Sequence, residues 1–155
     1  MVCSILILDY KKQEDEGNHK MKLTRLIKLK FNSFKSRIHG DTNIIFYGSD
    51  KSGKTMCALR EARKHGGKIL IVSDTLHDAD KLKMKLQGVD VYTATRLNLD
   101  RCRGISFETV LIDNANCMDS VYASLIGIIF QRVIVTMGSD VKIMNHNNFK
   151  TIRFI

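Results

Sequence analysis

The apolar positions of this chain fall into short runs that alternate with amphipathic or polar segments. Apolar runs at residues 43–47, 68–72, 109–112 and 132–136 are typical of buried strands, and weaker runs occupy residues 89–92 and 150–154. Residues 55–64, 76–86 and 118–130 are rich in helix-forming residues, many with apolar side chains at helical spacing. Strands alternating with helices predict an α/β fold, a three-layer αβα sandwich with a mainly parallel central sheet.

The N-terminal part of the chain has a different pattern. An apolar run at residues 4–8 predicts a strand, and the polar residues 11–19 predict a loop. Residues 23–38 carry apolar side chains at helical spacing, which favours an amphipathic helix with a basic outer face over the alternative of a strand at residues 23–31. We predict that residues 1–20 are an N-terminal appendage and that residues 21–155 form a single domain.

The chain length, the length of its apolar runs and its net charge indicate where the protein is located and what kind of partner it binds. No apolar run approaches the roughly 20 residues of a membrane span, so we expect a soluble, cytoplasmic protein with no membrane partner. The net charge of +9, with no acidic residue between Glu16 and Asp41, favours a polyanionic partner, most commonly nucleic acid. The short chain of 155 residues would suit a small viral or mobile-element protein.

Residues 48–55 read G-S-D-K-S-G-K-T and fit the phosphate-binding pattern G-x-x-x-x-G-K-[ST] at every fixed position. A predicted strand precedes them and a predicted helix follows, as this loop requires. The amides of such a loop cradle phosphates, the lysine reaches the β- and γ-phosphates, and the final hydroxyl helps to hold Mg²⁺. We therefore predict binding of ATP, or another nucleoside triphosphate, with magnesium. The predicted nucleotide-binding residues are Gly48, Ser49, Asp50, Lys51, Ser52, Gly53, Lys54 and Thr55.

A second acidic position follows another predicted strand. The apolar residues 110–112 end at Asp113, and in phosphate-loop NTPases such an aspartate holds Mg²⁺ beside the loop hydroxyl, here Thr55. The alternative is that Asp113 only caps the next turn. The phosphate-binding loop, Asp113 and Gly138 all follow strands, so a parallel sheet would bring them to one edge.

The order of these segments resembles the first, RecA-like motor domain of superfamily-one and superfamily-two helicases. Residues 48–55 look like motif I, residues 69–82 are similar to motif Ia, residues 110–116 stand where those enzymes have D-E-A-[HD], and residues 133–140 resemble motif III. The resemblance implies a P-loop NTPase with Lys54, Asp113 and Asn114 in catalytic positions. It implies nucleic-acid contacts from Ser73, Thr75, Thr93 and Thr95, and γ-phosphate sensing by Gly138 and Asp140. Ser73 and Thr75 equally fit capping of the helix that begins at Leu76, and turn formation is slightly favoured for Thr93 and Thr95.

Two departures from the helicase pattern limit the expected activity. Asn114 stands where the family has its second acid, and an amide cannot accept a proton from the attacking water; loss of a general base typically costs about 10²–10⁴-fold. The chain ends at Ile155, which leaves no room for the second motor domain that supplies an arginine finger, worth about 10³–10⁵ in rate. We expect weak or partner-stimulated ATP hydrolysis, contact with single-stranded DNA or RNA, and a protein partner that supplies the finger or second domain.

Two other functions remain open from the sequence. One is a non-enzymatic adaptor, a degenerate helicase-like domain that binds nucleotide to assemble with a partner. The other is a nucleoside or nucleotide kinase, which the chain length and the phosphate-binding loop also fit. The kinase is the weaker alternative, because the sequence has no clear arginine-rich lid.

Overall fold

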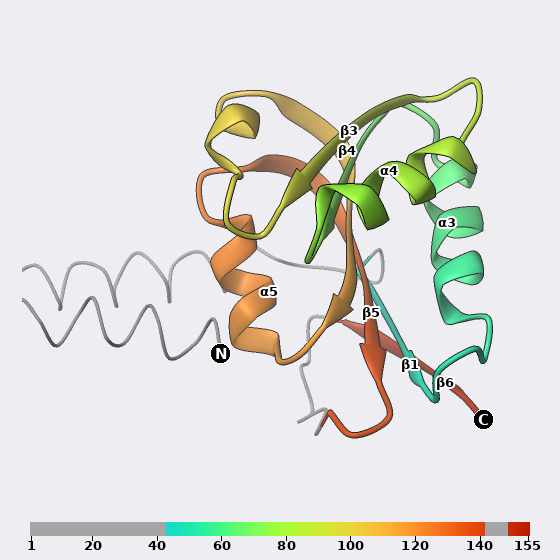
Figure 1. The fold of residues 1–155 in the computed structure, drawn as a ribbon. Coiled ribbons are helices and arrows are strands. Elements are labelled where there is room, and N and C mark those ends of the chain that lie inside the picture. The colour runs from blue at the N-terminus through green and yellow to red at the C-terminus, as the bar shows by residue number, and fades with distance from the viewer. Residues whose placement is uncertain (1–42, 142–148) are drawn as a thin grey trace, which may run out of the picture. The chain divides into compact units, whose positions relative to one another are not determined.

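The computed structural model describes residues 43–141 and 149–155, which contain one sheet of six parallel strands in the order β3-β2-β4-β5-β1-β6 (Figure 1). Four predictions lie outside the described residues: the strand at 4–8, the boundary near residue 20, the helix or strand within 23–38, and the basic stretch between Glu16 and Asp41. The strands are β1 (Ile44–Gly48), β2 (Lys68–Ser73), β3 (Asp90–Thr95), β4 (Ser106–Ala115), β5 (Ile129–Gly138) and β6 (Lys150–Phe154).

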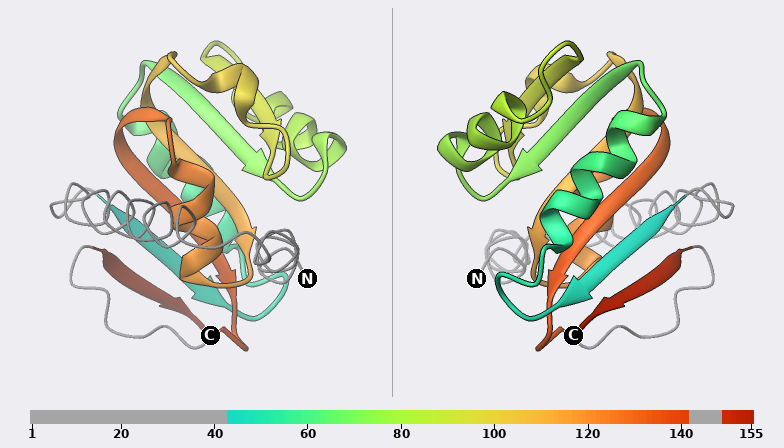
Figure 2. Two further views of the ribbon diagram at one scale, coloured as in Figure 1. Left: turned by 90° about the vertical axis from the view of Figure 1, so that its left-hand side faces the viewer. Right: turned by 90° about the vertical axis from the view of Figure 1, so that its right-hand side faces the viewer.

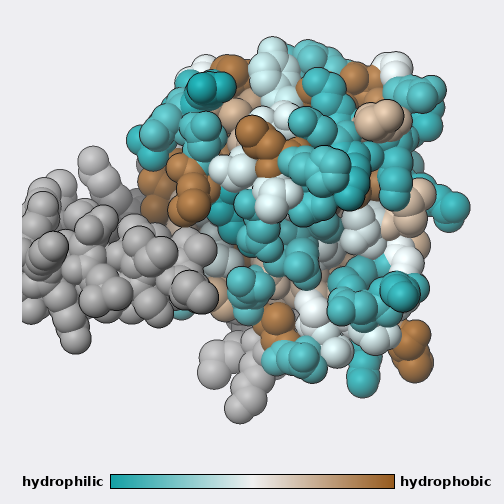
Figure 3. Space-filling model, viewed as in Figure 1, coloured by the Kyte–Doolittle hydropathy of each residue, from teal (hydrophilic) through white to brown (hydrophobic). Residues whose placement is uncertain are grey.

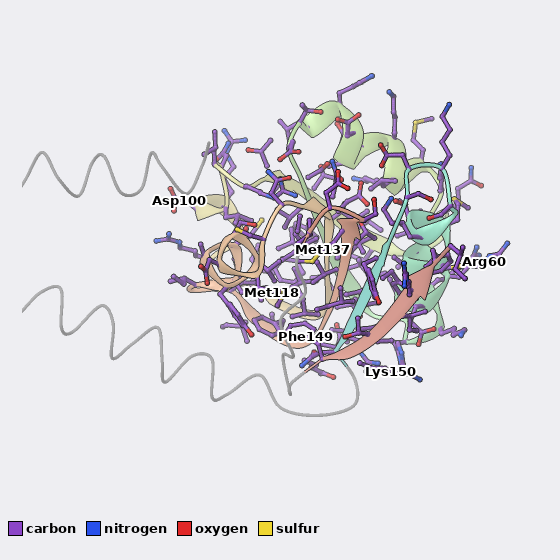
Figure 4. The ribbon with its side chains drawn as sticks, turned by 90° about the horizontal axis from the view of Figure 1, so that it is seen from below. Arg60, Asp100, Met118, Met137, Phe149 and Lys150 are labelled. Carbon is purple, nitrogen blue, oxygen red and sulfur yellow. The ribbon has the colours of Figure 1, made fainter. Side chains whose placement is uncertain are left out.

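Helices cover both faces of this sheet. Helices α3 (Lys54–Lys64) and α4 (Leu76–Met84) lie on one face, and α5 (Met118–Leu125) lies on the other (Figure 2). Arg60 of α3 and Met118 of α5 stand on opposite sides of the strands when the molecule is seen from below (Figure 4). This arrangement confirms the predicted three-layer α/β/α class and is consistent with a RecA-like fold.

Alternation along the central strands divides the core into two layers. In β1, Ile44 and Phe46 pack with Leu59 and the other buried side chains of α3, whereas Ile45 points to the opposite face. Strands β2, β4 and β5 alternate in the same way, and most of their apolar residues are fully buried. Burial on both faces explains why these strands are continuous apolar runs in the sequence. Each fully buried aliphatic side chain contributes about 1.5–3 kcal/mol.

Several boundaries differ from the sequence prediction. The helix predicted at 118–130 ends at Leu125, because Gly127 adopts a φ of 76° that turns the chain, and residue 129 already begins β5. Apolar residues 128–130 fit either element, so their pattern alone was ambiguous. β4 and β5 extend beyond the predicted 109–112 and 132–136, β3 covers 90–95 rather than 89–92, and α4 stops at residue 84. A short 3₁₀ helix, η1 (Asp100–Cys102), was not predicted.

The strand order determines which loops become neighbours. Because all strands are parallel, their carboxyl ends lie at one edge of the sheet, as predicted. β5 lies between β1 and β4, pairing Gly138 with Gly48 on one side and Val135 with Ile112 on the other. The loop after β1 and the end of β4 therefore flank the end of β5.

The face of the described domain that Figure 3 shows is mostly hydrophilic, with a smaller number of apolar residues among the polar ones. Among the described residues, no helix is long and apolar enough to cross a membrane. The large apolar side chains with the greatest exposure include Met84, Leu97 and Ile155.

Candidate functional site

The loop that joins β1 to α3 has the backbone of a tight, glycine-dependent turn. Gly53, the N-cap of α3, has a φ of 89°, and Lys51 also has a positive φ, 61°. The Ser52 amide donates to the Ser49 carbonyl at 3.4 Å, which closes the turn. The first turn of α3 contains no acidic residue, so its amide groups and helix dipole present positive potential.

The first glycine of the loop is also required by packing. A Cβ atom at Gly48 would lie 2.3 Å from the carbonyl oxygen of Phe154, on the neighbouring edge strand β6. No side chain fits this space without a shift of the backbone. Gly48 therefore lets β6 run directly beside the end of β1.

Lys54 is almost completely buried at the start of α3 although it carries a charge. Its Nζ donates to the Ser49 carbonyl at 3.0 Å and lies 3.6 Å from the Asp50 carboxylate. The Asp50 side chain is 95% exposed, so it offers only a weak, solvent-screened pairing. The ammonium group is thus held across the loop by groups that an anionic ligand can replace.

One carboxylate oxygen of Asp113, at the end of β4, accepts hydrogen bonds from two hydroxyl groups. Thr55 from α3 donates to Oδ1 at 3.1 Å, and Thr136 from β5 donates to the same atom at 2.7 Å. These three residues come from three different elements and meet at the carboxyl edge of the sheet. The structure thus joins Thr55 and Asp113, the two residues predicted to hold magnesium.

Thr136 was not among the predicted site residues. It is fully buried, and besides donating to Asp113 it accepts a hydrogen bond from the Asn114 amide at 2.7 Å. The only sign of this role in the sequence was that Thr136 is the single polar residue within the apolar run 133–137. Assigning its role required the knowledge that β5 lies next to β4.

The backbone of β4 is irregular where the site residues stand. Its pairing with β5 skips from Ile112 to Ala115, and Asn114 has a φ of 53°. Asparagine adopts this left-handed conformation more readily than most residues. The Asn114 side chain is exposed at this bulge, in the position where the helicase pattern has an acid.

Arg96, in the turn after β3, is a second residue that the prediction missed. Its side chain is only 5% exposed; one terminal nitrogen pairs with the Asp74 carboxylate, and the other donates to the Asp113 carbonyl at 2.6 Å. Burial lowers the pKa of the Arg96 guanidinium, and the Asp113 carboxylate and Cys117 oppose that effect. Arg96 and Asp113 are 17 residues apart in the chain, and only the fold brings them together.

Two of the predicted nucleic-acid contacts have their hydroxyl groups engaged with carboxylates. Thr75 is the N-cap of α4, accepting from the Asp78 amide and donating to the Asp78 carboxylate at 2.7 Å. Thr93 donates to Asp80 at 2.8 Å. The capping alternative for Thr75 is therefore the arrangement in the structure, and acidic side chains lie beside both threonines.

The remaining predicted residues lie at the ends of their strands. Ser73 is buried at the end of β2, and Thr95 is half-buried at the end of β3. Gly138 lies beside Gly48 and hence beside the phosphate-binding loop. Asp140 is exposed two residues further on, where it accepts a hydrogen bond from Ser139 at 3.3 Å.

The donor atoms at Thr55 and Asp113 suit magnesium. Mg²⁺ prefers oxygen ligands and is usually held by one or two carboxylates together with substrate phosphates and water. The described residues contain no group of three or more His, Cys, Asp or Glu side chains that would hold a metal by themselves. The hydroxyl and carboxylate present here therefore fit a metal that is bound together with a phosphate ligand.

No protein-family model matches the chain, and no curated protein matches it significantly.

Proposed function

We propose that this protein is a helicase-like P-loop NTPase domain that binds a magnesium–nucleoside triphosphate complex, with ATP as the first candidate. The observation that carries the proposal is the contact between Thr55, in the phosphate-binding loop, and Asp113, which is 58 residues later in the chain. A chance glycine-rich turn would have no reason to meet a carboxylate at the end of another strand. An intracellular location follows from this proposal, because nucleoside triphosphates are found inside cells.

Each residue of the site has a defined task in this proposal. The amides of the loop and of the first turn of α3 hold the phosphates. The Lys54 ammonium group leaves the Ser49 carbonyl and the Asp50 carboxylate and binds the β- and γ-phosphates. Thr55 and Asp113 hold the magnesium ion, which when bound neutralises charge on the phosphate oxygens. Thr136 keeps the Asp113 carboxylate turned toward Thr55. Gly138, which pairs with Gly48 at the start of the loop, is the proposed sensor of the terminal phosphate, and Asp140 is the further candidate.

Hydrolysis is proposed to be weak or stimulated by a partner. Asn114 can orient a water molecule through its amide but cannot accept its proton, a deficit of about 10²–10⁴-fold. A protein partner that supplies an arginine finger would add about 10³–10⁵ in rate.

The proposal includes contact with single-stranded DNA or RNA. The net charge of +9 supports it, whereas the carboxylates beside Thr75 and Thr93 oppose a phosphate contact at those two residues. Binding that depends on basic residues should weaken steeply as salt rises, because counterions are released from the nucleic acid. A flat salt response would remove nucleic acid from the proposal.

A nucleotide-dependent adaptor is the second candidate. It is favoured by Asn114, which replaces the expected acid and lies exposed in a left-handed turn. Such a protein would bind Mg·ATP and change its affinity for a partner without turnover.

The deciding experiment measures ATP binding and steady-state hydrolysis by the full chain with Mg²⁺, with and without single-stranded DNA or RNA. Lys54→Ala is the test variant, and Lys64→Ala is the matched control, since Lys64 is an exposed lysine on the same helix that pairs with Glu61. We expect Lys54→Ala to abolish ATP binding and Lys64→Ala to bind like the wild type. Equal ATP affinity in all three proteins would refute the proposal.

The same assay separates the remaining functions. Turnover that rises with nucleic acid supports the helicase-like ATPase, and Mg²⁺-dependent binding without turnover supports the adaptor. Turnover that requires an added nucleoside or nucleotide would instead identify a kinase.

A further inference from the structure

Two consecutive backbone groups at the end of β4 leave the hydrogen-bonding pattern of the sheet. Pairing of β4 with β2 ends at Ile112, and pairing with β5 resumes only at Ala115. The carbonyl of Asp113 and the amide of Asn114 lie in this gap. Backbone groups that leave a ladder need other partners, because an unpaired buried donor or acceptor is unfavourable.

Side chains from the neighbouring elements supply these partners. Thr136 accepts from the Asn114 amide at 2.7 Å, and Arg96 donates to the Asp113 carbonyl at 2.6 Å. The bulge is therefore held from two sides, by a strand residue and by the turn after β3. The peptide unit between Asp113 and Asn114 is fixed by these two contacts.

Arg96 occupies this position at an energetic cost. Its side chain is only 5% exposed, and its buried Nε has no hydrogen-bond partner among residues 43–141 and 149–155. Its ion-pair partner Asp74 is half exposed, so the charge of Arg96 is compensated only in part. A buried arginine with an unused donor is unfavourable for stability alone, which suggests that its position serves the site.

We propose that Arg96 is a positioning residue for Asp113, and that by holding the Asp113 carbonyl it sets the affinity of the site for magnesium. This inference rests on the proposed function. The guanidinium is a rigid, planar fork. Its two terminal nitrogens reach the Asp74 carboxylate, just after β2, and the Asp113 carbonyl, near the end of β4, so it fixes the two strand ends relative to each other. Lysine carries the same charge but has no fork and cannot hold both groups in this geometry.

The test measures how much Mg²⁺ the full chain needs for half-maximal ATP binding, and compares ATP affinity in EDTA. Groups that orient a metal ligand typically change metal affinity by about 10–100-fold when replaced. We therefore expect Arg96→Lys to need at least about tenfold more Mg²⁺, with ATP affinity in EDTA unchanged. Asp74→Asn removes only the outer anchor of the fork and should shift the requirement in the same direction by less.

Arg103→Lys is the matched control. Arg103 is also paired with an aspartate, Asp100 at 3.1 Å, but its side chain is 59% exposed and holds no backbone group of the site. This variant should keep the Mg²⁺ requirement of the wild type. A general effect of replacing arginine with lysine would appear in both variants.

Each outcome bears on the inference. A Mg²⁺ requirement of Arg96→Lys within twofold of the wild type would overturn it, as would an equal loss of ATP affinity with and without Mg²⁺. If circular dichroism shows that Arg96→Lys does not fold, Asp74→Asn decides, and an unchanged requirement there overturns the inference. Absence of ATP binding by the wild type would instead remove the proposed function, and this inference with it.

Discussion

Replacing Thr136 with valine tests the hydrogen-bond arrangement around Asp113. Valine has nearly the same shape as threonine, so the substitution leaves no cavity in the fully buried position. It removes only the hydroxyl group, which donates to the Asp113 carboxylate and accepts from the Asn114 amide, both at 2.7 Å. Any change in stability therefore comes from these two hydrogen bonds.

The expected magnitude follows from the nature of the two bonds. A hydrogen bond to a charged group contributes about 1.5–3 kcal/mol and a neutral one about 0.5–1.5 kcal/mol, and part of this effect is the penalty for leaving the Asn114 amide unpaired. We expect Thr136→Val to lower the free energy of unfolding by about 2–4 kcal/mol. We also expect the Mg²⁺ requirement for ATP binding to rise, because Asp113 loses one of the groups that orient it.

The same sheet contains a matched control. Thr109 in β4 is also fully buried, but its hydroxyl oxygen has no hydrogen-bond partner within the part of the chain that the structure describes. Thr109→Val removes an unsatisfied polar group and should be neutral or stabilising. Urea unfolding of both variants gives the comparison, with an unchanged dependence on denaturant as the sign of an intact native state. Equal losses of stability in the two variants would refute the reasoning.

Two further substitutions test the site. Asn114→Glu should raise ATP hydrolysis, since it supplies a general base worth about 10²–10⁴-fold in rate. Glutamate in the left-handed backbone of this position costs about 1–2 kcal/mol of stability, and Asn114→Gln is the control because it carries similar strain without a base. Equal turnover in the two variants would contradict the assignment of Asp113 to the metal. Gly48→Ala should lower the unfolding temperature more than Gly53→Ala. A Cβ at Gly48 meets the Phe154 carbonyl at 2.3 Å, whereas a Cβ at Gly53 meets no atom of the described residues within 4 Å. Thermal unfolding checks this, and a larger effect at Gly53 would contradict the packing role of Gly48.

Much of the fold could be predicted because its signals are local. Each central strand is buried on both faces, so the apolar runs at 43–47, 68–72 and 109–112 mark strands without reference to the rest of the chain. The prediction was wrong where a local pattern fits two elements: residues 128–130 are apolar in either a helix or a strand, and the conformation of Gly127 ended the helix at Leu125.

Some residues of the candidate site could likewise be predicted from the sequence, and others could not. The phosphate-binding loop is continuous in sequence, so its residue types and spacing were enough to predict it. Thr136 and Arg96 are distant from Asp113 along the chain, and nothing in their local sequence links them to it. Thr75 and Thr93 show the converse. Threonine hydroxyl groups suit a phosphate contact, but in the structure these two donate hydrogen bonds to the carboxylates of Asp78 and Asp80.

By itself, the sequence determined the alternating elements, the loop at 48–55 and the acid at the end of an apolar strand, because backbone preference and burial depend on residues close together in the chain. Only the tertiary structure decided that β5 lies between β1 and β4, that β4 bulges after Ile112, and that Arg96 and Thr136 hold the bulge. Strand order and bulge geometry depend on which distant segments pack together, and hydrogen bonds a few ångströms long exist only once that packing is complete.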